Sequence, residues 1–360
     1  MKSKVKLKQI VKKKVLPRIH HYGTAVKAVD DLIDKVIEQA GGSAYGHLLK
    51  DIMVTAIKLQ EDEIGRGDVR LMTIALKELR YAFKIFQPFK HVRKAAIFGS
   101  ARIPKDTREY KQARDFAKAI VDRGWMVITG AASGIMQAGN EGAGRQNSFG
   151  VNIQLPFEQE ANEYILQDQK LINFKYFFTR KLMFMSESDA TALFPGGFGT
   201  HDEGFETLTL VQTGKTNPRP IVCIDPPGSQ YWSLWKHYLE KELMEKKLID
   251  PTDMKLIHFT HDVDDAVDYM SNFYRNYHSC RYIKHQFVMR LKNPISRLRL
   301  QQINKKFSDL LVSGSFKQML KPFEEEEAEE HTHDLARLVF HFKRNHFARL
   351  TMLIHELNRD

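Results

Sequence analysis

The stretch FPGGFGTHDEGFE, residues 194–206, is the segment from which the fold of this chain can be inferred. A short apolar run, 191–194, leads into it, and the amphipathic stretch 200–212 continues from it. Apolar runs of this length are typical of buried strands, whereas the longer stretch has the spacing of a helix. A strand, a glycine-rich turn and a helix in this order predict one unit of a parallel sheet covered by helices.

The same alternation extends in both directions, from Lys94 to about Tyr277. Six apolar runs are candidate strands: Ala95–Phe98, Trp125–Thr129, Gly150–Leu155, Thr191–Phe194, Pro220–Ile224 and Lys255–Phe259. Six amphipathic stretches are candidate helices: Arg108–Arg123, Gly134–Gly142, Thr179–Glu187, Thr200–Gln212, Trp232–Glu245 and Val263–Tyr274. Strands separated by helices of this length predict an α/β fold, a Rossmann-like parallel sheet with helices on both faces.

Helices are also expected on both sides of this region. Residues 26–86 have apolar positions three and four apart, which two glycine-containing breaks divide into three helices. Two more amphipathic helices are expected after residue 281, with apolar positions in 291–310 and 335–353. The acidic run EEEEAEE, 324–330, separates them and is expected to be a solvated linker, because its carboxylates repel one another.

These patterns divide the chain into three expected parts. They are an N-terminal helical extension with a basic tail (1–90), the Rossmann-like domain (91–280) and a C-terminal helical extension (281–360). The lysine-rich start, Lys2–Lys14, is expected to be a frayed tail.

Composition limits the classes of function. The net charge is +11, but residues 1–29 hold nine Lys/Arg and no acid, and residues 281–323 hold ten against one, so the basic excess flanks a nearly neutral centre. We therefore do not expect nucleic acid as the ligand. The two cysteines, Cys223 and Cys280, indicate neither a disulfide framework nor a thiolate metal site. No apolar run could span a membrane and no secretory signal opens the sequence, so we expect a cytoplasmic protein.

The glycine loop is the first candidate for chemistry. In a parallel sheet, ligands bind where a strand's carboxyl end leads into the next helix. Gly196, Gly197 and Gly199 allow a tight loop there, and Thr200 stands at the helix start. Free backbone N–H groups, the helix dipole and a hydroxyl then converge on one point, which predicts a phosphate site.

Three charged residues lie near this predicted phosphate site. Glu203 follows Thr200 by one helical turn and would face the sugar attached to a bound phosphate; alternatively, it caps the helix through the N–H of Thr200. Arg180 and Lys181 fall near the start of another predicted helix, where cations oppose the dipole. Arg180 can grip an anion with two hydrogen bonds, and Lys181 can act as a point charge.

Two further strand ends are candidates for ligand binding. Ser100 follows the first strand, and the small-residue loop Gly130–Gly134 follows the second. The latter lacks the G-x-G-x-x-G pattern, which disfavours a dinucleotide.

Together these residues resemble those of the LOG family, the cytokinin riboside 5′-monophosphate phosphoribohydrolases long described as lysine decarboxylases. The resemblance covers roughly residues 93–277 and rests on Ser100, the Gly130–Gly134 loop, the Arg180-Lys181 step and the PGGxGTxxE pattern of 195–203. LPFEQEAN (155–162), FKYFFTRK (174–181), FPGGFGT (194–200) and LTLVQTGK (208–215) are similar to the longer bacterial branch.

This resemblance implies a Rossmann-like fold and hydrolysis of a nucleoside 5′-monophosphate to free base and ribose 5-phosphate. It places the catalytic pair at Arg180 and Glu203. It implies a substrate-binding set of Ser100, Gly130, Gly134, Glu158, Lys181, Gly196, Gly197, Gly199 and Thr200. It also implies a homo-oligomer, a dimer or larger. Nothing in these segments demands a metal or an organic cofactor, so we expect none.

One departure from the family keeps an alternative open. Relatives usually have a glycine run where this chain has Gly130-Ala131-Ala132-Ser133, and alanine resists a positive φ. A non-catalytic nucleotide sensor, whose helical flanks signal to a partner, is therefore a second hypothesis. A pyridoxal-phosphate decarboxylase is a third, although Lys181 beside Arg180 lacks the context of a Schiff-base lysine.

Overall fold

The computed structural model describes residues 22–155, 160–327 and 329–359. The chain divides into two compact units, Met1–Ile74 and Ala75–Asp360, each of which is described by itself. The first contains helices α1 (Lys27–Gln39) and α2 (Gly46–Glu61), and α3 (Arg66–Phe86) begins in it, so the three expected N-terminal helices are confirmed. The lysine-rich start lies outside the described residues.

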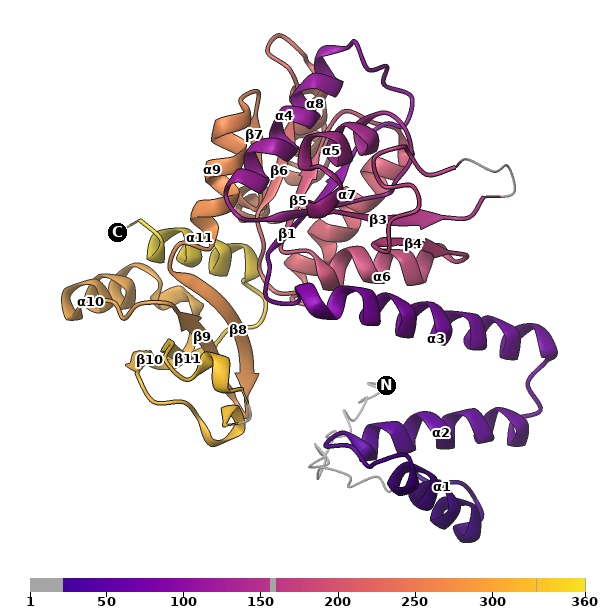
Figure 1. Cartoon of the computed structure of the whole chain (residues 1–360). Coiled ribbons are helices and arrows are strands. Elements are labelled where there is room, and N and C mark those ends of the chain that lie inside the picture. Colours follow the sequence, from indigo (N-terminus) through magenta and orange to yellow (C-terminus); the bar gives the residue numbers. More distant parts are fainter. Residues whose placement is uncertain (1–21, 156–159, 328, 360) are drawn as a thin grey trace, which may run out of the picture. The chain divides into compact units, whose positions relative to one another are not determined.

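The second unit is built around a seven-stranded parallel sheet (Figure 1). Its strands run in the order β4-β3-β2-β1-β5-β6-β7. Their bounds are β1 Lys94–Phe98, β2 Met126–Thr129, β3 Ser148–Ile153, β4 Leu171–Phe174, β5 Ala190–Leu193, β6 Ile221–Ile224 and β7 Ile257–Thr260. All six predicted strands are present and the predicted α/β class is confirmed; the edge strand β4 was not predicted.

Helices cover both faces of this sheet because its strands alternate their side chains between two cores. On β1, Ala95 and Ile97 belong to one core, whereas Ala96 and Phe98 belong to the other. The first core includes side chains of α4 (Arg108–Asp122), α5 (Ile135–Ala143) and α9 (Val263–Phe273). The second includes side chains of α6 (Phe177–Glu187), α7 (Phe198–Gln212) and α8 (Tyr231–Tyr238), together with the end of α3. The result is a three-layer α/β/α arrangement.

The C-terminal segment contains a second sheet that the sequence analysis did not predict. Helices α10 (Arg297–Lys306) and α11 (Phe347–Leu357) are present, as expected. Four antiparallel strands accompany them in the order β10-β11-β9-β8. These strands are β8 Tyr277–Ile283, β9 Gln286–Leu291, β10 Leu311–Met319 and β11 Ala336–Phe342. The helix expected from residue 335 is therefore wrong over β11, whose apolar residues are buried on both faces of the strand.

The acidic run 324–330 is not a wholly solvated linker, which corrects a second expectation. Glu326 is fully buried and forms ion pairs with Arg290 (2.6 Å) and Arg337 (2.9 Å). Glu329 also pairs with Arg290, at 2.7 Å. Two arginines from β9 and β11 thus neutralise this part of the run, because buried charges require partners.

The described helices are each too short or too polar to cross a lipid bilayer.

Candidate active site

The candidate site lies where the strand order of the parallel sheet reverses. Chain order runs outward in one direction from β1 to β4 and in the other from β5 to β7, so the crevice opens beyond the carboxyl ends of β1 and β5. The loops that follow these two strands are joined by a hydrogen bond from Ser100 N to Pro195 O, 3.0 Å. The sheet therefore brings Ser100 beside the glycine loop, although they are far apart in sequence.

The glycine loop presents the N-terminus of α7 to this crevice. The helix begins at Phe198 with Gly197 as its N-cap, so the first-turn N–H groups have no carbonyl four residues back. A Cβ at Gly196 would overlap Thr200 Oγ1 and lie 2.9 Å from Ser100 N, whereas a Cβ at Gly197 or Gly199 would meet open space. Gly196 is thus required for packing, and the other two leave room for a ligand.

This contrast makes a testable prediction. We expect Gly197→Ala to keep the melting temperature within about 1 °C of the parent, because the new methyl contacts nothing, and to raise the KM for a phosphorylated substrate roughly tenfold by occupying the anion's place. Gly196→Ala should instead lower the melting temperature by several degrees, since its methyl collides with the Thr200 side chain and with the backbone N of Ser100. Equal KM values for the Gly197→Ala protein and the parent would contradict the assignment.

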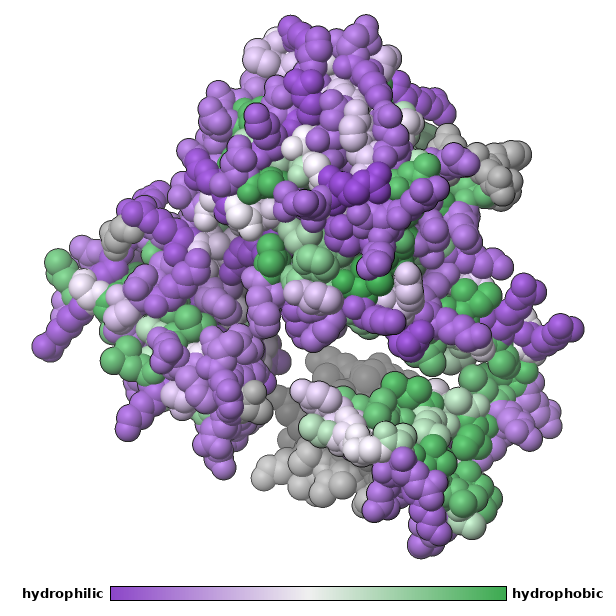
Figure 2. All heavy atoms as spheres, in the orientation of Figure 1, coloured by the Kyte–Doolittle hydropathy of each residue, from purple (hydrophilic) through white to green (hydrophobic). Residues whose placement is uncertain are grey.

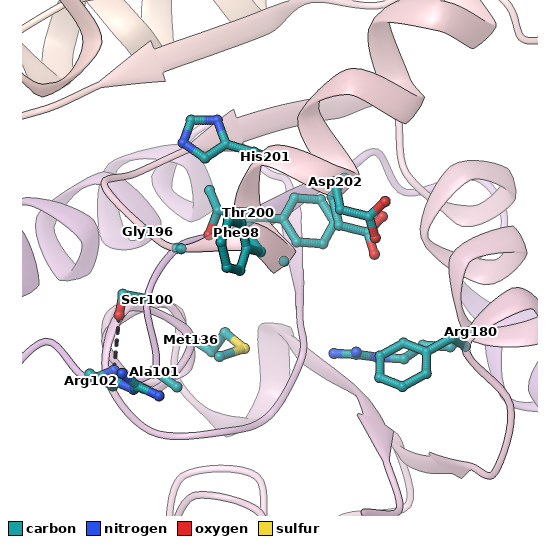
Figure 3. A pocket seen from close by; sticks show the side chains of 16 residues that line it. Phe98, Ser100, Ala101, Arg102, Met136, Arg180, Gly196, Thr200, His201 and Asp202 are labelled. Carbon is teal, nitrogen blue, oxygen red and sulfur yellow. Dashed lines mark hydrogen bonds between the residues drawn. The ribbon is translucent and has the colours of Figure 1, made fainter. Parts of the chain in front are cut away.

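An aromatic cluster on α8 holds the glycine loop from behind. Tyr231 Oη donates a hydrogen bond to Gly196 O. Its only proton is then used, so His201 Nε2, 2.8 Å from Tyr231 Oη, acts as the donor to that oxygen. The His201 ring stacks on Tyr231 and contacts Trp232 and Trp235, and burial lowers its pKa. His201 therefore borders the cavity with its ring held by this cluster, and it supports the glycine loop (Figure 3).

Arg180 enters the site from the first turns of α6. Glu78 on α3 fixes the start of this helix by accepting hydrogen bonds from Lys175 N (2.7 Å) and Thr179 Oγ1 (2.6 Å). The Arg180 side chain donates from Nε to Val151 O at 2.8 Å, and Figure 3 shows its guanidinium reaching into the cavity. Burial lowers the pKa of Arg180 and nearby Glu203 raises it.

Gly130, one of the predicted substrate-binding residues, supports Arg180 from behind. A Cβ at Gly130 would overlap Arg180 Nη2 and lie 2.6 Å from Met136 Sδ. The absence of a side chain at position 130 therefore lets the guanidinium occupy its place. Gly130 itself is not among the residues that line the cavity.

Glu203 is a buried carboxyl group on α7 with an unsatisfied oxygen. Only 6% of the residue is exposed, and its Oε2 has no hydrogen-bond partner in the part of the chain that the structure describes. Burial raises its pKa to about 7, against the opposing effects of Lys181 and Arg180. Because α7 begins at Phe198 and has no side-chain cap, Glu203 is not the capping-box partner considered above.

These groups share one cavity of about 750 Å³ (Figure 3). Seven residues of the predicted site line it: Ser100, Arg180, Gly196, Gly197, Gly199, Thr200 and Glu203. Residues that the sequence analysis did not single out also line it: Phe98, Gly99, Ala101, Arg102, Met136, Phe177, Phe198, His201 and Asp202. Those flanking Ser100 and Thr200 could have been found as neighbours of the motifs. Met136 and Phe177 carry no such signal.

Besides Gly130, three predicted residues lie apart from the cavity lining or outside the described residues. Lys181 pairs with Asp202 at 2.9 Å and with Glu206, and does not line the cavity. Gly134 has φ 64°, and a Cβ on it would overlap Ser100 O, so it allows two loops to pack closely. Glu158 lies outside the described residues.

The loop after β2 has a glycine-like conformation despite its alanines. Ala131 has φ 61°, a conformation that costs a non-glycine residue about 1–2 kcal/mol. Its N–H donates to Thr129 Oγ1 (3.0 Å), and its carbonyl accepts from Asn162 N (2.8 Å) and Nδ2 (3.0 Å). The expectation that alanine would resist a positive φ is therefore wrong for Ala131, which these hydrogen bonds hold in place.

Comparison with known proteins shows which family the residues around this site resemble. Residues 129–270 match a family model described as "Possible lysine decarboxylase". A cytokinin riboside 5′-monophosphate phosphoribohydrolase of Mycobacterium tuberculosis is 27% identical over 175 residues, 46% of this chain and 88% of that protein.

Two solved structures show weaker likeness. The molybdenum cofactor carrier protein of Chlamydomonas reinhardtii is 18% identical and covers 49% of this chain and 94% of its own, with a TM-score of 0.34. DNA processing protein A of Helicobacter pylori is 14% identical and covers 49% of this chain and 79% of its own, with a TM-score of 0.33. The family model covers the glycine loop, Arg180 and Glu203, and together with the mycobacterial relative it supports a relationship between the part of the chain that carries this site and the LOG family.

Proposed function

We propose that this protein hydrolyses the N-glycosidic bond of a nucleoside 5′-monophosphate, AMP-like or of the cytokinin type, to free base and ribose 5-phosphate. The observation that carries the proposal is a buried carboxyl, Glu203, in the same cavity as the open N-terminus of α7. A phosphate on that helix N-terminus would be held by N–H groups and the helix dipole. The sugar attached to it then lies within the reach of a group one helical turn further on.

The proposed hydrolysis uses the charges of Glu203 and Arg180. The bond from C1′ to the base nitrogen breaks, both electrons leave with the base, and C1′ acquires oxocarbenium character. Ionised Glu203 stabilises this cation or takes a proton from the attacking water, whose oxygen bonds to C1′; the base gains a proton as it leaves. Arg180 orients the phosphate or ribose, so binding energy remote from C1′ positions the reacting carbon.

One incubation tests the proposal. The purified protein is mixed with AMP and, separately, with other common nucleoside monophosphates, and free base is separated by chromatography. We expect release of base and ribose 5-phosphate in equal amounts, with Glu203→Gln as the inactive control. Nucleotide binding by calorimetry without release of any base would contradict the proposal and select the sensor.

The structure weakens the reasons for the rival hypotheses. The sensor hypothesis rested on alanine distorting the loop after β2, but Ala131 has the conformation expected of glycine. A pyridoxal-phosphate decarboxylase needs a lysine for its Schiff base. None of the described residues that line the cavity is a lysine, and Lys181 is paired with carboxylates.

The expected homo-oligomer stays a prediction, which light scattering in solution would test. Exposed apolar side chains support it. Phe198 is 97% exposed at the start of α7, and Phe177, Phe178 and Leu182 on α6 are exposed as well. Helices α1 and α2 also expose many apolar side chains, and Figure 2 shows hydrophobic residues on them. Apolar clusters of this kind commonly mark contact surfaces between proteins.

A further inference from the structure

A second, smaller cavity lies at the opposite edge of the parallel sheet from the candidate active site. Its volume is about 160 Å³. Arg93, Asp189 and Arg219, which line it, come just before the amino ends of β1, β5 and β6. In a parallel sheet all amino ends lie at one edge, so this cavity shares no residue with the glycine loop. Ser188, Asn217 and Ser279 add polar groups to its wall.

Arg219 is a buried cation bound only by neutral oxygens. It is 6% exposed. Its Nη1 donates to Ser188 Oγ (3.1 Å), and its Nη2 donates to Met185 O (2.8 Å) and Thr216 Oγ1 (2.9 Å). Its Nε has no partner among the residues that the structure describes. Buried charges are normally paired with an opposite charge, because removing them from water is costly.

The neighbouring groups compensate this positive charge only in part, through the nearby carboxylate of Asp189. Arg93 pairs with Asp189 at 2.7 Å, which neutralises both of them. Lys94 donates to the carbonyls of Phe89 and Val92, and Lys292 donates to that of Tyr274, so these ammonium groups also bind neutral oxygens. Burial lowers the pKa of Arg219, Lys94 and Lys292, and Arg93 lowers that of Lys292 further. Asp189 opposes the effect of burial on the pKa of Arg219, and Asp189 and Glu187 oppose it on that of Lys94.

A purely structural role accounts for part of this arrangement. Met185 lies in the last turn of α6, whose carbonyls carry partial negative charge, and a cation there is favourable. The dipole amounts to roughly half an elementary charge. It therefore does not balance a full guanidinium charge, and it explains neither the free Nε nor the adjacent cavity.

We propose that this cavity binds a small tetrahedral oxyanion of the size of inorganic phosphate or sulfate, with Arg219 as its buried counter-charge. The amide of Asn217 offers a neutral donor beside it, and Ser279, whose hydroxyl contacts His278 Nδ1 at 2.9 Å, adds a polar group to the wall. The cavity is large enough for such an ion and its charge is of the required sign. This site is independent of the proposed hydrolysis, since it uses none of the residues of the candidate active site.

The test has to separate this site from the glycine loop, which is also expected to bind phosphate. Gly197→Val is therefore used as the background, because its side chain extends into the open space of the candidate active site. Melting temperature is measured in sodium phosphate, sodium sulfate and sodium chloride at equal ionic strength. We expect the two oxyanions, but not chloride, to raise it, and calorimetry to show one phosphate per chain. No oxyanion-specific rise in this folded protein would overturn the proposal.

A substitution of nearly the same shape tests whether phosphate binds in this cavity. Asn217→Asp places a carboxylate at the cavity without a change in shape, so it should raise the melting temperature without phosphate and weaken phosphate binding at least tenfold. Asn173→Asp, the same change on the exposed face of β4, should do neither. Arg219→Met should abolish phosphate binding if it folds; if it does not, the Asn217→Asp result decides alone. Equal phosphate affinity in Asn217→Asp and Asn173→Asp would contradict the assignment.

Discussion

Replacing Glu203 by glutamine should nearly abolish base release while making the protein more stable above pH 7. The ionised carboxylate is the group that the proposed mechanism needs, and its loss should lower kcat on the order of a hundredfold or more. The same carboxylate is buried with an oxygen that lacks a hydrogen-bond partner in the described residues. Glutamine has nearly the same shape and carries no charge to desolvate.

The gain in stability should depend on pH in a defined way. Burial raises the pKa of Glu203 to about 7 from the ordinary value of 4.5. An acid whose pKa is raised on folding binds its proton more tightly in the folded state, so the folded state loses stability as pH rises from 4.5 to 7. Above pH 7 the loss amounts to about 3 kcal/mol. The advantage of Glu203→Gln should therefore be near zero at pH 4 and close to that value at pH 8.

Urea unfolding of both proteins at several pH values measures this difference. Glu206→Gln is a suitable comparison, because Glu206 is on the same helix but pairs with Lys181. Removing that carboxylate should not stabilise the protein at high pH. If the stability difference between Glu203→Gln and the parent did not depend on pH, the pKa of Glu203 would not be raised by burial in the folded protein.

The parallel sheet could be predicted from the sequence because most of its strands are short apolar runs followed by a turn and a helix. Thr191–Phe194 and the loop after it illustrate this, since β5 and α7 lie within two residues of the predicted bounds. Strand β4 was missed because it lies at the edge of the sheet, and only two of its four residues, Ile172 and Phe174, are buried.

The C-terminal sheet could not be predicted for a different reason. The residues of β11, ARLVFHF, are nearly all buried. A run that is buried on both sides lacks the alternation of apolar and polar residues that marks a half-exposed strand. Its apolar positions happen to fit helical spacing too, and only pairing with β9 and β10 decides between the two.

The motif residues of the site could be identified from the sequence, but their electrostatics could not. The pattern PGGxGTxxE locates Thr200 and Glu203, yet the raised pKa of Glu203 depends on how deeply α7 is buried. Likewise, nothing near Arg219 in the sequence indicates a cation without a carboxylate partner, and nothing in EEEEAEE singles out Glu326 as the buried member. Such properties arise from packing between segments distant in sequence.

Replacing Arg180 by methionine should lower kcat/KM on the order of a hundredfold and also shift its dependence on pH. The pKa of Glu203 is raised by burial and held down by Lys181 and Arg180. Loss of Arg180 should therefore move the midpoint of the activity profile above pH 7, because the carboxyl ionises later. Arg180→Lys keeps the charge but loses the hydrogen bond from Nε to Val151 O, so activity should fall while the midpoint stays.

Lys181→Met separates two effects of positive charge at this site, namely lowering the pKa of Glu203 and orienting the substrate. Lys181 lowers the pKa of Glu203 but does not line the cavity. Its loss should move the midpoint upward, and activity should then recover once the pH is high enough to ionise Glu203. In Arg180→Met the activity should stay low at every pH, because the group that orients the substrate is gone. If the Arg180→Met protein recovered the parent's activity at high pH, Arg180 would act only through the charge state of Glu203 and would have no direct part in binding.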